Sequence, residues 1–234
     1  MNHDYFKHIF LYIIPLWIIL ISGCKNIGEK EIVIISTNDI HGRIEQFSKL
    51  ATFVKRIKEE HPNVILVDAG DRFTGNPYVD HAKEKGFPII SLMNDLGYEV
   101  GTLGNHEFDF GQKILRARIN DATFPIICAN INSSRGELDS IPPYYIIEKD
   151  GIKLGFIGFV QTETDQIPST NPERLKDITF DHYLDKVEDY KPLKRQCDVL
   201  IGLTHLGVDK DSILATQMPE LDIIIGGHTH TLLE

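Results

Sequence analysis

The stretch Glu31-Ile32-Val33-Ile34-Ile35-Ser36-Thr37-Asn38-Asp39-Ile40-His41 places a β-branched apolar run directly before two side chains of metal-ligand type. The run predicts a buried strand over 31–37. In an extended segment, side chains at positions i and i+2 point to the same side, so Asp39 and His41 can hold one ion. A lone Asp-x-His pattern is more often a turn or a surface feature, so the prediction depends on the rest of the chain.

Three later apolar runs, at 64–67, 199–203 and 221–225, and a short strand expected near 98–102 also lead into polar side chains that can bind metals. Each run has the length of a strand, and the strand ends of one sheet edge bring distant ligands together. Single Gly-Asp pairs and single histidines are commonplace, whereas an ordered series after strand-like runs is rare by chance. The series predicts a metal centre, whose further candidate ligands are Asp71, Asn105, His205, His228 and His230.

The segments between these runs favour an α/β fold. Apolar spacing and Gly, Pro and Asn punctuation predict helices near 44–60, 79–96, 111–120, 181–195 and 210–217, and one more strand at 124–129. The pair Asp150-Gly151 predicts a hairpin between strands at 144–148 and 152–159. Strands and helices that alternate around one hairpin predict stacked mixed sheets with helices outside.

The chain has 234 residues, 42% apolar and 25% charged, which is ordinary for one globular domain. Its formal net charge of -10 comes with no basic patch, so binding to a nucleic-acid polymer is not expected. Acidity does not exclude a phosphate substrate, because bound cations can supply local positive charge. Cys128 and Cys197 adjoin apolar runs, which favours buried thiols over a disulfide.

Residues 1–23 have the pattern of a secretory signal: Lys7 precedes an apolar run that ends in small residues before Cys24. The ending Ile21-Ser22-Gly23-Cys24 resembles the bacterial lipobox, which implies a lipidated Cys24 and an exported protein anchored to a cell-envelope membrane. A non-cleaved anchor, or a signal in which Cys24 is incidental, is the alternative. Residues 24–30 form a short polar tether, and a domain is expected over 31–234.

Mixed carboxylate, amide and imidazole ligands suit Zn, Mn or Fe better than Ca or Mg, which prefer oxygen. The carboxylate of Asp71 has two oxygens and can bridge two ions. Two ions about 3.5–4 Å apart can clamp a phosphoryl group and lower the pKa of a shared water, which would then attack phosphorus in line. The ligand series therefore predicts two divalent ions and a phosphoesterase.

The ordered motifs Asp39-x-His41, Gly70-Asp71, Gly104-Asn105-His106-Glu107, His205 and Gly227-His228-x-His230 resemble those of the calcineurin-like metallophosphoesterases. The residues around the first and third motifs, Thr37-Asn-Asp-Ile-His-Gly42 and Gly104-Asn-His-Glu-Phe-Asp109, are similar to those of the 5′-nucleotidase and UDP-sugar hydrolase branch. The resemblance covers about residues 31–234, the catalytic domain of that branch. It implies a four-layer αββα sandwich of two mixed sheets and hydrolysis of nucleotides or related phosphate esters.

The resemblance also implies roles for individual side chains. One ion would take Asp39, His41, Asp71 and His230, and the other would take Asp71, Asn105, His205 and His228. His106 would act on the phosphate in the transition state, with Asp109 orienting it. Asp109 can also cap the helix expected near 110, and the two roles are compatible. Arg43 is a candidate for phosphate contact, with a surface ion pair as the alternative.

The sequence leaves the substrate and the extent of the domain undecided. The relatives carry a C-terminal domain that recognises the base, and nothing in 31–234 corresponds to it. The chain ends right behind its last motif, which suggests a fragment or a domain that completes its sheet with a partner domain. Cyclic-nucleotide phosphodiesterases and sulfur-ester hydrolases are alternative activities of the scaffold, and a metal-stabilised binding module or an inactive subunit is the non-enzymatic alternative.

Overall fold

The structure of the protein is a computed structural model that describes residues 29–232. The predicted signal at 1–23, Cys24 and most of the tether lie outside the described residues. No helix within the described part of the chain is long and apolar enough to cross a membrane. The described residues from 31 onward form one compact unit, which holds every candidate ligand.

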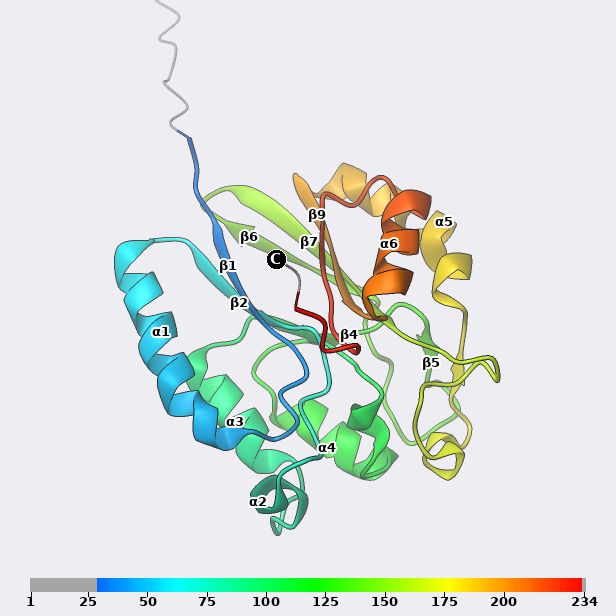
Figure 1. Ribbon diagram of the computed structural model, residues 1–234. Helices are drawn as coiled ribbons and strands as arrows, with labels where there is room; N and C mark the ends of the chain where they lie inside the picture. The colour runs from blue at the N-terminus through cyan, green and yellow to red at the C-terminus, as the bar shows by residue number, and fades with distance from the viewer. Residues whose placement is uncertain (1–28, 233–234) are drawn as a thin grey trace, which may run out of the picture. The chain divides into compact units, whose positions relative to one another are not determined.

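Two four-stranded sheets form the centre of this unit (Figure 1). The first has the order β1-β2-β3-β4, and all its strands are parallel; they are β1 (Val33–Thr37), β2 (Val64–Asp68), β3 (Val100–Thr102) and β4 (Ile126–Ile127). The second has the order β10-β9-β7-β6; its strands are β6 (Tyr144–Lys149), β7 (Ile152–Val160), β9 (Val199–His205) and β10 (Ile223–Ile225).

The second sheet is mixed, because β6 and β7 form the antiparallel hairpin predicted around Asp150-Gly151. The prediction of two mixed sheets is wrong for the first sheet. Each connection in that sheet runs through a helix, and a helical crossover returns the chain in the same direction. The hairpin lies wholly in the second sheet and leaves the first one parallel.

Helices cover the outer face of each sheet, which gives the four layers expected from the sequence (Figure 1). The first sheet carries α1 (Phe47–Glu60), α3 (Phe87–Leu96) and α4 (Gln112–Asp121). The second carries α5 (Val187–Tyr190), α6 (Val208–Gln217) and the 3-10 helices η4 (Tyr183–Lys186) and η5 (Lys191–Gln196). Three further 3-10 turns are η1 (Ile44–Gln46), η2 (His106–Phe108) and η3 (Pro172–Leu175).

Three details differ from the sequence prediction. The expected helix at 79–96 is two helices, α2 (Pro77–Asp80) and α3, because Gly86 adopts a φ of 74° just before α3. The expected helix at 181–195 is the series η4, α5 and η5, in which Pro192 supplies no backbone donor. A small antiparallel sheet of β5 (Ile131–Asn132) and β8 (Thr179–Phe180) was not predicted, because two-residue strands leave no periodic signal.

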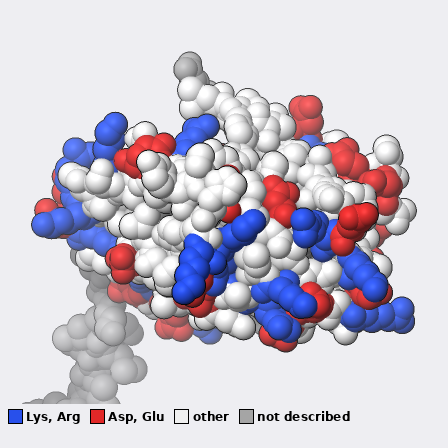
Figure 2. Space-filling view, turned by 90° about the horizontal axis from the view of Figure 1, so that it is seen from below, with Lys and Arg blue, Asp and Glu red and all other residues white. Residues whose placement is uncertain are grey.

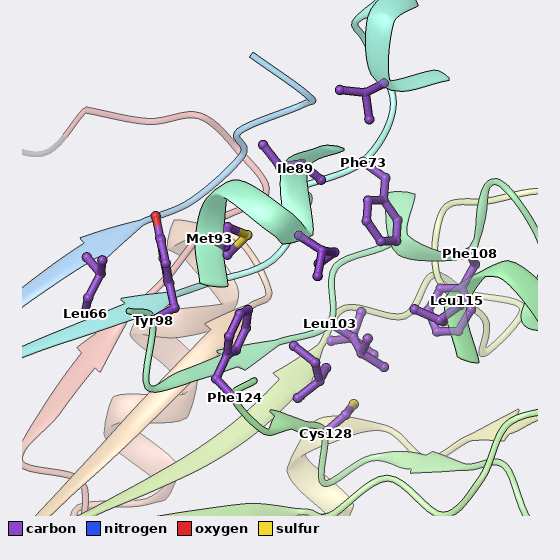
Figure 3. Packing of buried hydrophobic residues seen from close by; sticks show 14 of the residues in the cluster. Leu66, Phe73, Ile89, Met93, Tyr98, Leu103, Phe108, Leu115, Phe124 and Cys128 are labelled. Atoms are coloured by element: carbon purple, nitrogen blue, oxygen red, sulfur yellow. The ribbon is translucent and has the colours of Figure 1, made fainter. Parts of the chain in front are cut away.

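Buried apolar side chains fill the spaces on both faces of the first sheet. Between the first sheet and its helices, a cluster packs side chains from β1, β2, β4, α1, α3 and α4. Figure 3 labels ten of its residues: Leu66, Phe73, Ile89, Met93, Tyr98, Leu103, Phe108, Leu115, Phe124 and Cys128. The neighbouring residues Ile65 and Val67 of β2 belong instead to the cluster between the two sheets. This alternation is what a strand buried on both faces requires. Cys128 is a buried free thiol and Cys197 a half-buried one.

The loops after β1 and β2 continue side by side beyond the strands. Asp39 N–H donates to Gly70 O at 3.0 Å, and His41 N–H donates to the carbonyl oxygen of Asp71 at 3.0 Å. The parallel ladder is thereby extended into the loops, and candidate ligands from two segments of sequence are held next to each other.

The surface charge is mixed on the face that Figure 2 shows. Lys and Arg side chains alternate there with Asp and Glu side chains, and no continuous region of one sign covers the face.

Candidate metal centre

Seven predicted ligands meet at the carboxyl ends of the parallel strands. They come from the loops after β1, β2, β3 and β10 and from the last residue of β9. Three groups of side chains bring their ligand atoms within 4.8 Å of one another. The groups are Asp39, His41 and His230; Asp71, His205 and His228; and His41, Asp71 and His106.

The first group lies toward the solvent. His230 Nε2 is 3.3 Å from Oδ1 of Asp39 and 3.3 Å from Nε2 of His41. His41 Nε2 in turn lies 3.9 Å from Oδ2 of Asp71. These four residues are the ones that the family resemblance assigns to a single ion.

The second group lies deeper, with Asp71 and His205 buried and His228 half-buried. His205 is fully buried, and its Nε2 lies 2.9 Å from Oδ2 of Asp71. His228 Nδ1 lies 3.1 Å from Oδ1 of Asn105. The same oxygen of Asp71 therefore lies within 3.9 Å of histidines from both groups, which is the place of a bridging carboxylate.

The donor set fits divalent cations in two respects. The Nδ1 atoms of His205 and His41 lie 2.7 Å and 3.1 Å from the carbonyl oxygens of Ala69 and Thr74, an arrangement that directs each Nε2 toward the centre. His205 Nε2 is buried without an aligned hydrogen-bond partner. A buried nitrogen that faces carboxylates in this way requires a cation or a proton beside it.

The shifted pKa values of Asp71 and His205 also indicate that positive charge is stabilised at this centre. Burial alone would raise the pKa of Asp71, but its contact with His205 and the backbone N–H of His106 lower it to about 2. Burial would lower the pKa of His205, but Asp71 raises it to about 9. For His228, burial and then the charge of His205 lower the pKa and favour the neutral, ligating form. The centre thus holds negative charge that must be balanced locally.

The backbone at the centre is strained where the ligands are presented. Five ligand residues adopt positive φ, a region that non-glycine residues rarely enter: Asp39 (51°), His41 (47°), Asp71 (57°), His228 (87°) and His230 (52°). Such conformations cost on the order of 1–3 kcal/mol each and gather at functional sites. Gly104 is required for close approach, because a Cβ there would lie 2.7 Å from the backbone nitrogen of Asp71 and overlap its carboxylate.

A buried ionic network under the ligands was missed by the sequence analysis. Glu107 is fully buried and accepts hydrogen bonds from the N–H groups of Asp71 (2.9 Å), Arg72 (2.8 Å) and Gly104 (2.6 Å). Arg72 pairs with Asp68 at 2.8 Å and with Glu107 at 3.7 Å. Glu107 stands inside a quoted motif, but only the tertiary fold shows that it holds the Asp71 and Gly104 loops together.

His106 and Asp109 lie beside the ligands and form a pair. His106 Nδ1 is 2.6 Å from Oδ2 of Asp109, so this pair does not use the Nε2 atom of the ring. The hydrogen bond to Asp109 raises the pKa of His106, so the protonated form persists at higher pH. Burial would raise the pKa of Asp109, but hydrogen bonds from His106 and two threonines lower it. The prediction that Asp109 caps the helix near 110 is wrong, because the N-cap of α4 is Gly111 and no side chain caps that helix. Asp109 instead directly follows η2.

Arg43 is exposed at the start of η1, close in sequence to Asp39 and His41. Its guanidinium makes no ion pair or hydrogen bond with any residue between 29 and 232, so the surface ion pair considered from the sequence is not formed there. Arg43 lines a cavity of about 310 Å³ together with Asn38 and Asp39. Its proposed contact with phosphate stays a prediction.

The chain is similar in sequence to known phosphoesterases. Residues 32–232 match the model of the calcineurin-like phosphoesterase family. The snake venom 5′-nucleotidase of Naja atra is 32% identical over 236 residues, which cover 88% of this chain and 42% of the relative. The trifunctional nucleotide phosphoesterase protein YfkN of Bacillus subtilis is 32% identical over 85% of this chain and 16% of its own length.

The fold is also similar to that of a solved 5′-nucleotidase structure. The 5′-nucleotidase precursor from Thermus thermophilus superposes with a TM-score of 0.78 at 28% sequence identity, over 87% of this chain and 42% of that one. The chain thus spans less than half the length of each relative described here.

Proposed function

The chain belongs to the calcineurin-like phosphoesterase family, and from this premise we propose that it is a metal-dependent phosphoesterase that hydrolyses nucleotides or closely related phosphate esters. The observation that carries the proposal is the convergence of two ligand groups on Asp71, with His106 beside them and held by Asp109 through Nδ1. The names of the relatives, which act on nucleotides, support the substrate class.

In the proposed reaction, two sets of residues hold two divalent cations. Asp39, His41, Asp71 and His230 would hold one divalent cation, and Asp71, Asn105, His205 and His228 the other. When bound, the two cations supply Lewis acidity and lower the pKa of a water nucleophile. Mn, Zn and Fe suit this mixture of imidazole, carboxylate and amide donors.

His106 contributes charge and a proton. Its Nδ1 is held by Asp109, so Nε2 can donate to a phosphoryl oxygen as negative charge develops, or protonate the departing oxygen. Because the pKa of His106 is raised, the ring carries its proton in a wider pH range than a free histidine does. The role differs from that of a structural metal site, where an extra oriented imidazole has no use.

Base selectivity is proposed to lie outside residues 31–234. The groups gathered here are carboxylates, an amide, imidazoles and hydroxyls, which recognise a phosphoryl group and do not distinguish bases. The test is kcat/KM for AMP, UMP, UDP-glucose and p-nitrophenyl phosphate, with 2′,3′-cyclic AMP and a sulfur ester included. Comparable values for the phosphomonoesters support the proposal. A preference above about 100-fold for one nucleotide, near 3 kcal/mol, would place base recognition in this domain. Preference for the cyclic or sulfur ester would favour those alternative activities.

Export and membrane anchoring through Cys24 form a separate proposal, supported by the lipobox-like Ile21-Ser22-Gly23-Cys24. Two or three acyl chains on Cys24 would anchor the protein stably, whereas one chain would be marginal. Mass spectrometry of the membrane-bound protein should find an acylated Cys24 as the first residue, and Cys24→Ser should release the protein or leave the signal uncut. An unmodified N-terminus at another residue would refute the anchor.

A further inference from the structure

The carboxylate of Asp109 is held by three donors rather than one. Oδ2 lies 2.6 Å from His106 Nδ1 and accepts the hydroxyl of Thr74 at 2.9 Å, while Oδ1 accepts the hydroxyl of Thr170 at 3.0 Å. Within the described residues, no other side-chain donor reaches Oδ1. Each oxygen is therefore fixed from a different direction, and rotation of the carboxylate about its bond to Cβ breaks at least one of these bonds.

The two threonines come from loops that are far apart in sequence. Thr74 belongs to the loop after β2 and has a φ of 54°, a costly conformation for a β-branched residue. Thr170 belongs to the segment between β7 and η3, and it is 61 positions away from Asp109. Thr74 Oγ1 also lies 3.2 Å from His106 Nδ1, but that nitrogen donates to the carboxylate, so the proton of the threonine hydroxyl goes to Asp109.

The segment that carries Thr170 contacts the centre at a second point. The side-chain amide of Asn105 donates from Nδ2 to the carbonyl oxygen of Ser169 at 3.0 Å. This bond turns the Oδ1 atom of Asn105 toward His228, at 3.1 Å. Ser169 and Thr170 therefore orient two neighbouring groups of the site, a candidate metal ligand and the partner of His106.

We propose that Thr170 is a positioning residue of the phosphoesterase reaction: its hydroxyl locks the Asp109 carboxylate, and through it the imidazole of His106, in the orientation that serves the transition state. The inference rests on the proposed function, because it assigns Thr170 a role in that reaction. Thr74 holds the other carboxylate oxygen and is the counterpart of Thr170. Loss of the Thr170 hydroxyl frees Oδ1, so the imidazole is held by a carboxylate that can rotate.

Kinetics of five variants test the role. Thr170→Val keeps the shape and removes the hydroxyl, so kcat should fall about tenfold with KM changed less than about twofold. Thr170→Ser should restore most of the rate. Thr164→Val is the matched control, because Thr164 is exposed in the same segment, and it should behave as the wild type. In a His106→Ala background, Thr170→Val should cause no further loss, because the two residues act as a unit. Additive losses, or no rescue by serine, would overturn the proposal.

A second measurement does not depend on activity. In the metal-free protein, the short bond between His106 and Asp109 should give a downfield imidazole N–H proton signal, assigned by its absence in His106→Ala. Thr170→Val should shift or broaden this signal, whereas Thr170→Ser and Thr164→Val should keep it. An unchanged signal in Thr170→Val would contradict the positioning role. A wild-type protein that shows the expected signal but hydrolyses none of the esters would instead refute the proposed function.

Discussion

His205 Nε2 lies 2.9 Å from Oδ2 of Asp71, in a buried pair without an aligned hydrogen bond. Ala69 O lies 2.7 Å from the other ring nitrogen, which fixes how the ring is turned. A lone pair and a carboxylate that face each other at this distance repel unless positive charge lies with them. Asp71 also approaches His41 at 3.9 Å, so the same oxygen faces ligands from two strands. This shared oxygen is the reason for the two-cation account.

The first prediction separates catalysis from metal binding. His106→Ala should lower kcat roughly 10²–10⁴-fold while the metal content stays that of the wild type, because His106 serves the transition state. His81→Ala, which changes an exposed histidine on the C-terminal side of α2, is the control. Elemental analysis and initial rates are measured on the same samples. Loss of metal together with activity would reassign His106 as a ligand.

The second prediction concerns stability. Glu107→Gln should lower the free energy of unfolding by about 2–4 kcal/mol, because a buried carboxylate that accepts three N–H groups is replaced by an amide that accepts with one atom only. Chemical denaturation of the metal-free protein measures the change. Glu163→Gln, in an exposed loop, should change stability by less than about 0.5 kcal/mol. Equal stabilities of the two variants would show that the Glu107 network does not hold the loops.

The third prediction is a pH dependence. Burial raises the pKa of Asp211 to about 6, and the hydroxyl of Thr204 at 2.6 Å offsets this in part. A carboxyl whose folded pKa exceeds its unfolded value of 3.8 stabilises the fold below that value, and this contribution is lost as the pH rises through 6. The free energy of unfolding of Asp211→Asn should therefore exceed that of the wild type by about 1–3 kcal/mol at pH 8 and by much less at pH 4.5.

Unfolding of the metal-free proteins at both pH values measures this effect. Asp209→Asn, an exposed residue on the same helix, is the control and should show no such dependence. A gain in Asp211→Asn that is the same at pH 4.5 and pH 8 would contradict the raised pKa.

Much of the fold could be predicted because its signals are local. Three strands that present ligands, β1, β2 and β10, are continuous apolar runs, and Asp39, Asp71 and His228 follow them within a few residues. The Asp150-Gly151 hairpin likewise depends on adjacent residues. The parallel first sheet was harder to predict, because its strand order depends on how helices pack rather than on any residue pattern.

The supporting contacts could not be predicted, because they join residues that are distant in sequence. Glu107 binds the backbone of Asp71, 36 positions away, and Thr170 binds Asp109, 61 positions away. Nothing in the sequence around Thr170 marks its hydroxyl as different from that of Thr164. Ligands are chemically distinctive side chains, whereas the groups that orient them are ordinary residues whose role is set by tertiary structure.

The central claim is that this chain holds two divalent cations that share Asp71. The direct test is elemental analysis after the metal-free protein has been reconstituted with Mn or Zn and excess ions have been removed. The wild type and the control Asp95→Asn, which changes an exposed carboxylate on α3, should each retain about two ions per chain. Asp71→Asn should lose ions from both sites and most of the activity. Fewer than about one ion per wild-type chain, or a full complement of ions in Asp71→Asn, would contradict the account.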